Sequence, residues 1–375
     1  MAILATRLSR TLQKNSWLGF ILGGAAVHRC DNCPVLTVAL ATEGAPCVLK
    51  RLFSLPARRR DCFAIVAVLV LVSWSSAQSA TEFRRTLSVS VTEPLTLEVE
   101  ISSGDVQILY GRDGEVSIAG TAKASGDARL DDNFFPQVLT VRQEGNHLSL
   151  RHASIAAYPE RGISVLYRID VPYRTEIIAR TIRGKQTITG ILGPVTAVIE
   201  NGDVKASYIS RGFHGQAGSG NIDLQVIGEH AEAKTGAGNI SCERIPQGVS
   251  AETGDGDITL MITGPSAAIV RKGTGRIEVG GSRGSMIAST ADGDLHVKAI
   301  PHEDWKLTSS SGTIRLDLPP MAKMNLDAST GAGGFQIERD DIAKPQPGSR
   351  RVSQEVNGGG KRIEVHTESG RIVIR

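Results

Sequence analysis

A glycine recurs at nearly constant spacing through the second half of the chain, and this repeat constrains the fold more than any other feature. Successive copies are 18 or 19 residues apart, except for a last step of 21. A fixed period of this size is the sequence signature of a solenoid, in which each repeat forms one coil of a stack. The repeating glycines are Gly184, Gly202, Gly220, Gly238, Gly256, Gly275, Gly293, Gly312 and Gly333.

Apolar and polar side chains alternate on both sides of each repeating glycine. Aliphatic residues such as Ile222 and Leu224 stand two and four positions after it. A larger apolar residue and a small one, such as Val249 and Ala251, stand seven and five positions before it. Alternation with period two predicts half-buried strands. Each coil should therefore hold two strands, a glycine corner and a looser corner, and stacked coils should form two parallel sheets around one core.

The same pattern appears around Gly104 and Gly370, so we expect two further coils that extend the array beyond the regular block at its two ends. Strand patterns between residues 81 and 180 predict an irregular β cap with the first coil, which would cover the open sheet edges. Residues 181–375 are predicted to form the regular solenoid, with a loop at 340–352. The fold class expected is all-β, a single-domain parallel β-solenoid with two-strand coils of about 18 residues. The 41 glycines and the 4% aromatic content suit such a narrow core.

Residues 57–80 have the layout of a secretory signal peptide. Basic residues at 58–60 precede an apolar run from Phe63 to Val72, and small residues follow as far as Ala80. The run is well short of the roughly 20 apolar residues that a membrane-spanning helix needs. We therefore predict an exported protein, periplasmic, at the cell surface or secreted, with no stable membrane span after cleavage. Retention of the segment as an anchor is the alternative.

Because a signal peptide normally begins a chain, residues 1–56 are interpreted as an N-terminal extension or a mis-assigned start, and are predicted to be disordered. The spacing of Cys30 and Cys33 suggests redox chemistry or half a zinc site, but no second pair supports it. Without residues 1–80 the chain has 33 basic and 36 acidic residues, a net charge of −3. It shows no clustered basic face, so we expect no nucleic-acid partner. Only Cys242 remains, which excludes an internal disulfide.

Acidic corner residues raise two chemical alternatives. Calcium-binding β-rolls also have 18-residue coils, but they carry two glycine-rich turns per coil. Here one corner per coil is glycine-rich, and an acid such as Asp203 directly follows the second glycine. A polysaccharide-active enzyme would need paired carboxylates. Asp255 and Asp257 are expected two coils, or about 10 Å, from Asp292 and Asp294, which is loose for joint catalysis.

Two other motifs carry little weight. Residues 280–284 match G-x-S-x-G, but a nucleophile elbow requires a strand-to-helix turn, and a solenoid corner without a helix is predicted here. Seven histidines follow residue 80, among them His214, His230, His296 and His302, and they show no metal-ligand spacing. We therefore predict no catalytic, cofactor-binding or metal-binding residues and no cofactor.

A series of related motifs runs through the chain: ISSGDVQI, YRIDVPYRTEIIART, ENGDVKA, GSGNIDL, GAGNISC, GDGDITL, GTGRIEV, ADGDLHV, SSGTIRL and ESGRIVI. On these motifs, residues 85–375 resemble the bacterial putative-adhesin domain family, a domain of unknown function, and more loosely the head-GIN domains. Gln186 departs from the pattern, since an apolar residue is expected there. The resemblance implies a β-solenoid outside the cytoplasm and no catalytic residue.

These observations predict a non-catalytic, exported, adhesin-like scaffold. Its flat faces would bind an unidentified protein, peptide or glycan partner in the cell envelope. A polysaccharide-active β-helix enzyme and a calcium-binding β-roll stay open as alternatives, and the sequence predicts no oligomeric state.

Overall fold

The computed structural model describes residues 20–22, 25–28, 37–40, 82–125, 130, 134–152, 162–270 and 273–375. The chain divides into two units, residues 1–77 and 78–375. In the first unit, β1 (Phe20–Leu22), β2 (Ala25–His28) and β3 (Thr37–Leu40) form an antiparallel sheet in that order. The predicted signal peptide, residues 57–80, lies outside the described residues. Within the described ranges, no helix has the length and apolar character that crossing a bilayer would require.

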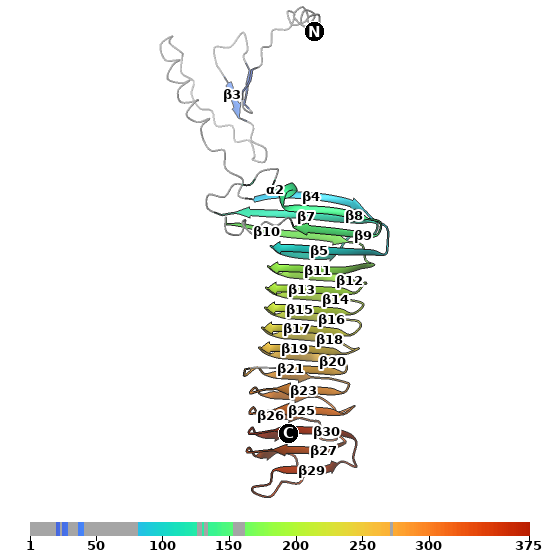
Figure 1. The fold of residues 1–375 in the computed structure, drawn as a ribbon, viewed down its shortest axis with the longest axis vertical. Coiled ribbons are helices and arrows are strands. Elements are labelled where there is room, and N and C mark those ends of the chain that lie inside the picture. Colours follow the sequence, from blue (N-terminus) through green and yellow to red (C-terminus); the bar gives the residue numbers. More distant parts are fainter. Residues whose placement is uncertain are drawn as a thin grey trace, which may run out of the picture. The chain divides into compact units, whose positions relative to one another are not determined.

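The second unit is built from two 14-stranded sheets. Their strands stack one above another from β4 to the coils near the C-terminus (Figure 1). Sheet I has the spatial order β4 (Glu82–Ser90), β7 (Glu115–Ala124), β10 (Ile163–Val171), β6 (Asp105–Tyr110), β12 (Gln186–Ile191), β14 (Val204–Ile209), β16 (Ile222–Ile227), β18 (Ile240–Ile245), β20 (Ile258–Thr263), β22 (Ile277–Gly280), β24 (Leu295–Lys298), β26 (Ile314–Asp317), β31 (Ile372–Ile374) and β28 (Phe335–Ile337). Sheet II has the order β8 (Leu139–Glu144), β9 (His147–His152), β5 (Leu95–Ser103), β11 (Thr175–Arg183), β13 (Val195–Asn201), β15 (Phe213–Ser219), β17 (Ala231–Ala237), β19 (Val249–Asp255), β21 (Ser266–Val270), β23 (Met286–Thr290), β25 (Trp305–Ser309), β30 (Lys361–Thr367), β27 (Met324–Thr330) and β29 (Arg351–Val356).

Each strand of the regular region pairs in parallel with its copy one coil away. Ile222 pairs with Ile240, and Leu224 with Cys242, so the apolar columns stay in register through the stack. These side chains are at most 1% exposed and belong to one continuous core. The predicted all-β solenoid with coils of about 18 residues is confirmed.

Successive coils approach each other very closely at the glycine corner. In six of the corners the glycine has φ between +128° and +143°, a region open almost only to glycine. A Cβ atom on Gly238 would overlap the carbonyl oxygen of Gly220 in the preceding coil. The corner glycines are therefore required by both backbone conformation and space.

Two ladders of side chains bind successive corners together. The Asn221 Oδ1 accepts a hydrogen bond from the Asn239 N–H at 2.9 Å, and the Asn239 Oδ1 accepts one from the Asp257 N–H at 2.8 Å. In a second column, the buried Thr253 hydroxyl donates to the carbonyl of Gly238 at 2.9 Å. Polar corner residues thus satisfy backbone groups that a sheet leaves unpaired at a turn.

The N-terminal end is an irregular cap, as predicted. The first coil, β5 and β6, pairs directly with β11 and β12, although 80 residues separate their corner glycines. The intervening chain forms β7 to β10 and the short helix α2 (Phe134–Val138), which the sequence did not predict. Antiparallel pairs β4–β7 and β8–β9 end the two sheets, and the buried Phe135 of α2 joins the core.

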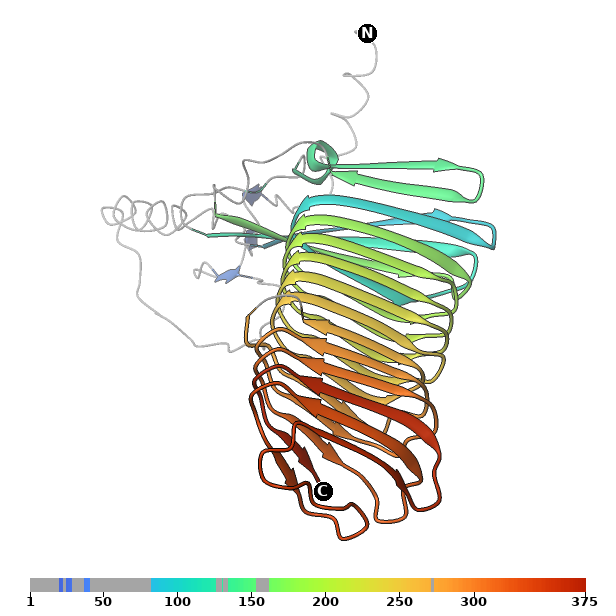
Figure 2. The same cartoon turned by 60° about the horizontal axis from the view of Figure 1, so that its bottom comes forward.

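At the other end, the order of coils differs from the order of the sequence. We predicted that the coil around Gly370 extends the array beyond the coil around Gly333. Instead, β30 pairs with β25 on one side and with β27 on the other. The last coil of the chain is inserted between the two that precede it (Figure 2). That expectation was wrong because both coils carry the same apolar alternation, which leaves their order to loop contacts.

Candidate functional site

The corner opposite the glycines carries outward side chains on a left-handed backbone. Six residues after the corner glycine, φ is +56° at Tyr208, +58° at Val226, +58° at Arg244 and +55° at Ile262. Side chains disfavour this region, at a cost of about 1–2 kcal/mol per residue, and β-branched residues are genuine outliers there. Four consecutive coils therefore hold a strained position.

Glycine takes the same place in the coils on either side. Gly190 precedes the four residues with φ +76°, and Gly281 follows them with φ +64°. This corner thus has a backbone that glycine adopts without strain, yet the middle coils present bulky groups. We call the column the corner ridge, and it consists of Tyr110 in the first coil, Tyr208, Val226, Arg244 and Ile262.

Most of the corner ridge is exposed. Tyr110 is 51% exposed, Tyr208 62% and Ile262 53%. Tyr173, from the turn after β10, packs edge-on against Tyr110 with ring centroids 5.4 Å apart, and Met261 adds a further partly exposed group. At the usual spacing of about 4.8 Å between strands, the column extends for about 24 Å along the stack. An apolar row of this kind on a surface is typical of an interaction site.

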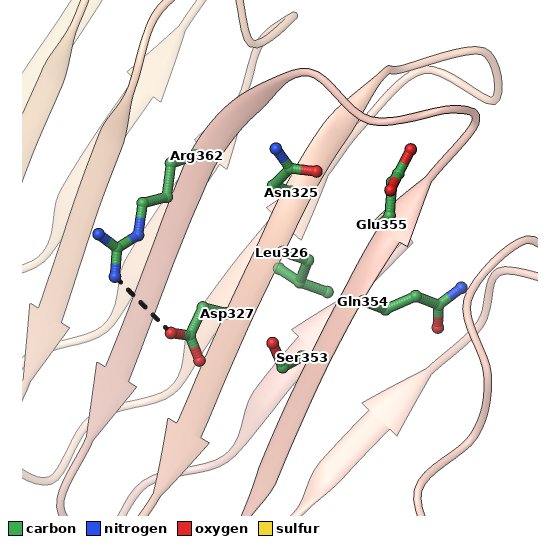
Figure 3. A pocket seen from close by; sticks show the side chains of 7 residues that line it. All are labelled: Asn325, Leu326, Asp327, Ser353, Gln354, Glu355 and Arg362. Carbon is green, nitrogen blue, oxygen red and sulfur yellow. Dashed lines mark ion pairs between the residues drawn. The ribbon is translucent and has the colours of Figure 1, made fainter.

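A polar hollow lies on the outer face of sheet II near its C-terminal end (Figure 3). Its volume is about 390 Å³. Arg351 donates two hydrogen bonds to the Asp327 carboxylate, at 2.9 and 2.8 Å, and Arg362 pairs with both Asp327 and Glu364. Asp327 is thus neutralised by two arginines, which does not favour a role for this carboxylate in acid-base chemistry. The hollow is lined by Asn325, Leu326, Asp327, Ser353, Gln354, Glu355 and Arg362.

A smaller, apolar hollow of about 230 Å³ lies at the N-terminal cap. Leu87 of β4, Ile118 of β7, Phe135 of α2 and Leu139 of β8 line it. Phe135 lies so close to Gly120 that a Cβ there would overlap its ring. The hollow is therefore where the cap helix closes the core between the two terminal strands.

Among the acids considered as catalytic or calcium-binding candidates, Asp257, Asp292 and Asp294 serve the corner ladder, whereas Asp255 is an exposed residue at the end of β19. Asp257 Oδ1 accepts the backbone N–H of Arg276, and Asp294 Oδ1 accepts that of Thr313, each at 2.8 Å. Asp292 Oδ1 accepts the Ser311 hydroxyl at 2.8 Å. In the part of the chain that the structure describes, no group of three or more His, Cys, Asp or Glu side chains could hold a metal ion.

The G-x-S-x-G match lies on a corner, as expected. Ser282 is 2% exposed and its hydroxyl donates to the carbonyl of Gly264 at 3.2 Å, so it is not presented as a nucleophile. Burial and the nearby Asp223 carboxylate raise the pKa of the Cys242 thiol far above its usual range. Both groups are therefore unreactive packing residues.

The named histidines do not converge. His214 pairs with Glu232 at 3.0 Å, and His296 with Asp317 at 2.7 Å, on different sheets. The most perturbed histidine is one that the sequence did not single out. His152 of the cap contacts the Ser102 hydroxyl at 2.8 Å and the Tyr167 hydroxyl at 3.0 Å, and burial lowers its pKa to about 4.

The corner ridge was not predicted from the sequence. A sequence does not specify backbone φ, and the polar residues that suggested binding chemistry lie at the glycine corner, on the opposite side of the coil. One signal was present: the column six residues after the corner glycine holds Gly190 and Gly281 at its ends and large residues between them. A position that alternates between glycine and bulky side chains indicates a left-handed corner.

Comparisons with known proteins found one family model and several solved structures to which the chain is similar. Residues 211–375 match the model of the Toastrack DUF4097 family, so the predicted resemblance is confirmed for this part of the chain. Among solved structures, the chain is similar to a putative cell adhesion protein from Clostridium sporogenes, at 10% identity over 78% of this chain and 98% of that one, with a TM-score of 0.22. Another is a putative adhesin from Parabacteroides distasonis, at 11% identity over 78% and 97%, with a TM-score of 0.31. A putative lipid binding protein from the same species, at 11% identity over 77% and 96%, has a TM-score of 0.31. No curated protein matches the sequence.

Proposed function

We propose that this protein is a non-catalytic, adhesin-like scaffold that binds a protein partner along the corner ridge. The observation that carries the proposal is the backbone of the ridge. Tyr208, Val226, Arg244 and Ile262 hold a conformation that favours glycine, and all of them except the partly buried Val226 are exposed. Strain at exposed side chains has no benefit for the core, so contact with a partner explains why these groups are bulky.

The chemistry of the corner ridge favours a protein over a glycan. Tyrosine, methionine and arginine are enriched at protein interfaces, and tyrosine and arginine supply many of their hot spots. Val226 and Ile262 present aliphatic tips, which offer neither a ring face for a sugar nor a hydrogen bond. A protein partner with an apolar surface and a polar rim would match both the aliphatic side chains of the ridge and its tyrosine and arginine groups.

The layout of residues 57–80 supports export, so the proposed place of action is the periplasm, the cell surface or the medium. We propose that residues 1–56 are an extension or a mis-assigned start and that residues 57–80 are removed. Residues 81–180 then form the cap with the first coil, and residues 181–375 form the regular array.

A site-specific photo-cross-linker tests the partner and the surface together. The cross-linker is placed at Tyr208 in the full chain and activated in an envelope fraction. It should form adducts that release peptides of a second protein on protease digestion. The control is Ile287, which is 53% exposed, compared with 62% for Tyr208, but lies on the flat face of sheet II. Equal adduct formation from both positions would show that the ridge has no special role.

The captured protein, once purified, allows a direct measurement of affinity. Tyr208→Ala and Ile262→Ala should each weaken binding at least about tenfold, as expected for interface hot spots. Ile287→Ala should leave the Kd unchanged. Unchanged affinity in the ridge variants would refute the proposal, and an adduct whose added mass is removed by glycosidases would replace the protein partner by a glycan.

A further inference from the structure

The inserted C-terminal coil occupies a slot that other parts of the chain build from both sides. Ile363 of β30 pairs with Trp305 of β25 and with Leu326 of β27. Ile372 of β31 pairs with Ile314 of β26 and with Phe335 of β28. Residues 361–375 are therefore enclosed between two coils that precede them in the sequence (Figure 1).

The inserted coil makes the same kinds of contact with its two neighbouring coils as the other coils of the array make with theirs. The Ile314 N–H donates to the Arg371 carbonyl at 2.9 Å, and the Ile372 N–H donates to the Gly334 carbonyl at 3.0 Å. A Cβ on Gly370 would overlap the carbonyl oxygen of Gly312, so only glycine fits there. The two neighbouring coils thus hold the backbone, the apolar columns and the corner of the inserted segment.

A short glycine-rich connection leads into the slot. β27 pairs with antiparallel β29 on one side and with parallel β30 on the other, so the chain must cross the start of β27. It does so at residues 357–360, where Asn357, Gly358 and Gly359 have φ of +51°, +81° and +76°. Gly360 packs so close to the Lys323 carbonyl that a Cβ would clash. This crossing is tight, and strained short hinges favour exchange of the segment that follows them.

The segment that connects β26 to β27 past the inserted coil has hydrogen bonds to a buried arginine. Residues 318–323 run from β26 to β27, and the Arg339 guanidinium donates to the carbonyls of Leu318, Pro319 and Pro320 at 2.8–3.0 Å. Arg339 is 7% exposed and is paired with Asp341. The Arg339 contacts use no residue of the inserted coil, although the Leu318 N–H also donates to the Arg375 carbonyl at 2.9 Å. The two walls of the slot are therefore connected directly by residues 318–323 as well as through the inserted coil.

We propose that the slot also accepts the C-terminal coil of a second copy of this chain, giving a dimer joined by exchanged coils. The occupant is defined by the structure, because the slot is complementary to residues 361–375 and every copy carries them. The exchanged contacts are those of the monomer, so association is opposed mainly by lost translational freedom and favoured by release of the tight crossing. The balance makes the dimer depend on protein concentration.

Thiol cross-linking in the full chain tests the exchange. Lys306 and Glu364 are paired neighbours on β25 and β30, and Lys306 faces outward. The test chain has serine at the N-terminal cysteines, whereas buried Cys242 is kept. The replaced residues are Cys30, Cys33, Cys47 and Cys62.

One protein sample carries Lys306→Cys and the other Glu364→Cys. They are mixed at high concentration, incubated and treated with a short bis-maleimide. A covalent dimer of the two variants forms only when the C-terminal coil of one chain lies beside β25 of another. The control is a mixture of Glu232→Cys and Ser250→Cys, a paired position on β17 and β19 in the middle of the array. We expect the test mixture to give at least about ten times more heterodimer than the control. Equal yields would overturn the proposal, provided that a chain carrying both Lys306→Cys and Glu364→Cys is cross-linked within itself.

A hinge variant gives a second measurement. Deleting Asn357, Gly358 and Gly359 leaves only two Cα–Cα steps, about 7.6 Å, between Val356 and Lys361, which is less than the roughly 9.6 Å between strands on either side of β27. The coil can then fill a slot only in another molecule. Light scattering should then report twice the monomer mass, with the far-UV circular dichroism of the parent. A folded monomer would refute the exchange. Neither measurement depends on the corner ridge, so the two proposals fail separately.

Discussion

Replacing Ile262 with glycine removes an exposed aliphatic side chain and, at the same time, the strain of a left-handed backbone. Ile287 offers a matched comparison, because it is also 53% exposed but lies in the extended strand β23. Both replacements lose the same side chain at the same exposure, and both introduce a glycine, which costs about 0.5–1 kcal/mol relative to alanine. Only Ile262→Gly relieves the strain of about 1–2 kcal/mol. Ile262→Gly should therefore reduce the free energy of unfolding by about 1–2 kcal/mol less than Ile287→Gly.

The alanine variants separate strain from every other difference between the two sites. Alanine keeps the Cβ atom that clashes in a left-handed conformation, so Ile262→Ala leaves the strain in place. The costs of Ile262→Ala and Ile287→Ala should then agree within about 0.5 kcal/mol. Subtracting the alanine pair from the glycine pair isolates the backbone contribution.

Equilibrium urea denaturation, followed by far-UV circular dichroism and by the fluorescence of buried Trp305, measures the four free energies. The two positions lie two coils apart, and neighbouring coils unfold together in a solenoid, so one transition reports on both. A double difference of zero or of the opposite sign would show that the ridge backbone is unstrained. The main reason for assigning the ridge to a partner would then be lost.

Three further predictions concern the fold. Gly238→Ala places a Cβ against the Gly220 carbonyl and should lower the free energy of unfolding by about 2–4 kcal/mol, whereas Gly334→Ala, which has open space around it, should change it by less than about 0.5 kcal/mol. Asn239→Ala removes the acceptor of one corner hydrogen bond and should cost about 1 kcal/mol in denaturation, with Asn239→Asp close to the parent protein. The pKa of His152 in the folded protein is about 4, below the usual value near 6.5, so the unfolded chain binds the proton first as the pH falls. The free energy of unfolding should therefore decrease by about 1–2 kcal/mol as the pH drops from 6.5 to 4. Denaturation midpoints across this range should lose that part of their pH dependence in His152→Gln, and a parent protein of constant stability would contradict the assignment.

The regular coils could be predicted from the sequence because each one repeats a complete physical pattern. Gly238 marks a corner that no other residue fits, and Ile240 and Cys242 mark the inward face of the strand that follows. Parallel stacking then follows, since the period is constant and each strand finds its copy in the next coil. The role of the corner acids was harder to predict, because Asp257 looks the same in sequence whether it binds a cation or caps an N–H.

The order of the last coils and the corner ridge could not be predicted, for two physical reasons. Leu326 and Ile363 have equivalent places in their coils, so apolar burial does not distinguish which coil lies outermost. That order depends on contacts made far along the chain, such as those of buried Arg339 with the bypassing segment. The ridge depends on backbone φ at Tyr208 and its equivalents, and a residue type only suggests φ where it is glycine.

The two corners of each coil differ in what the fold requires of them, and this difference bears on where binding can occur. At the glycine corner, Asn239 and Thr253 bond to the neighbouring coils, and added bulk meets backbone. A ligand that took these groups would have to break the stack. At the opposite corner, Tyr208 and Ile262 point outward from a turn that glycine forms equally well in other coils. Side chains at the opposite corner can therefore change without loss of the fold. A binding surface at this corner destabilises the solenoid less than one at the glycine corner would.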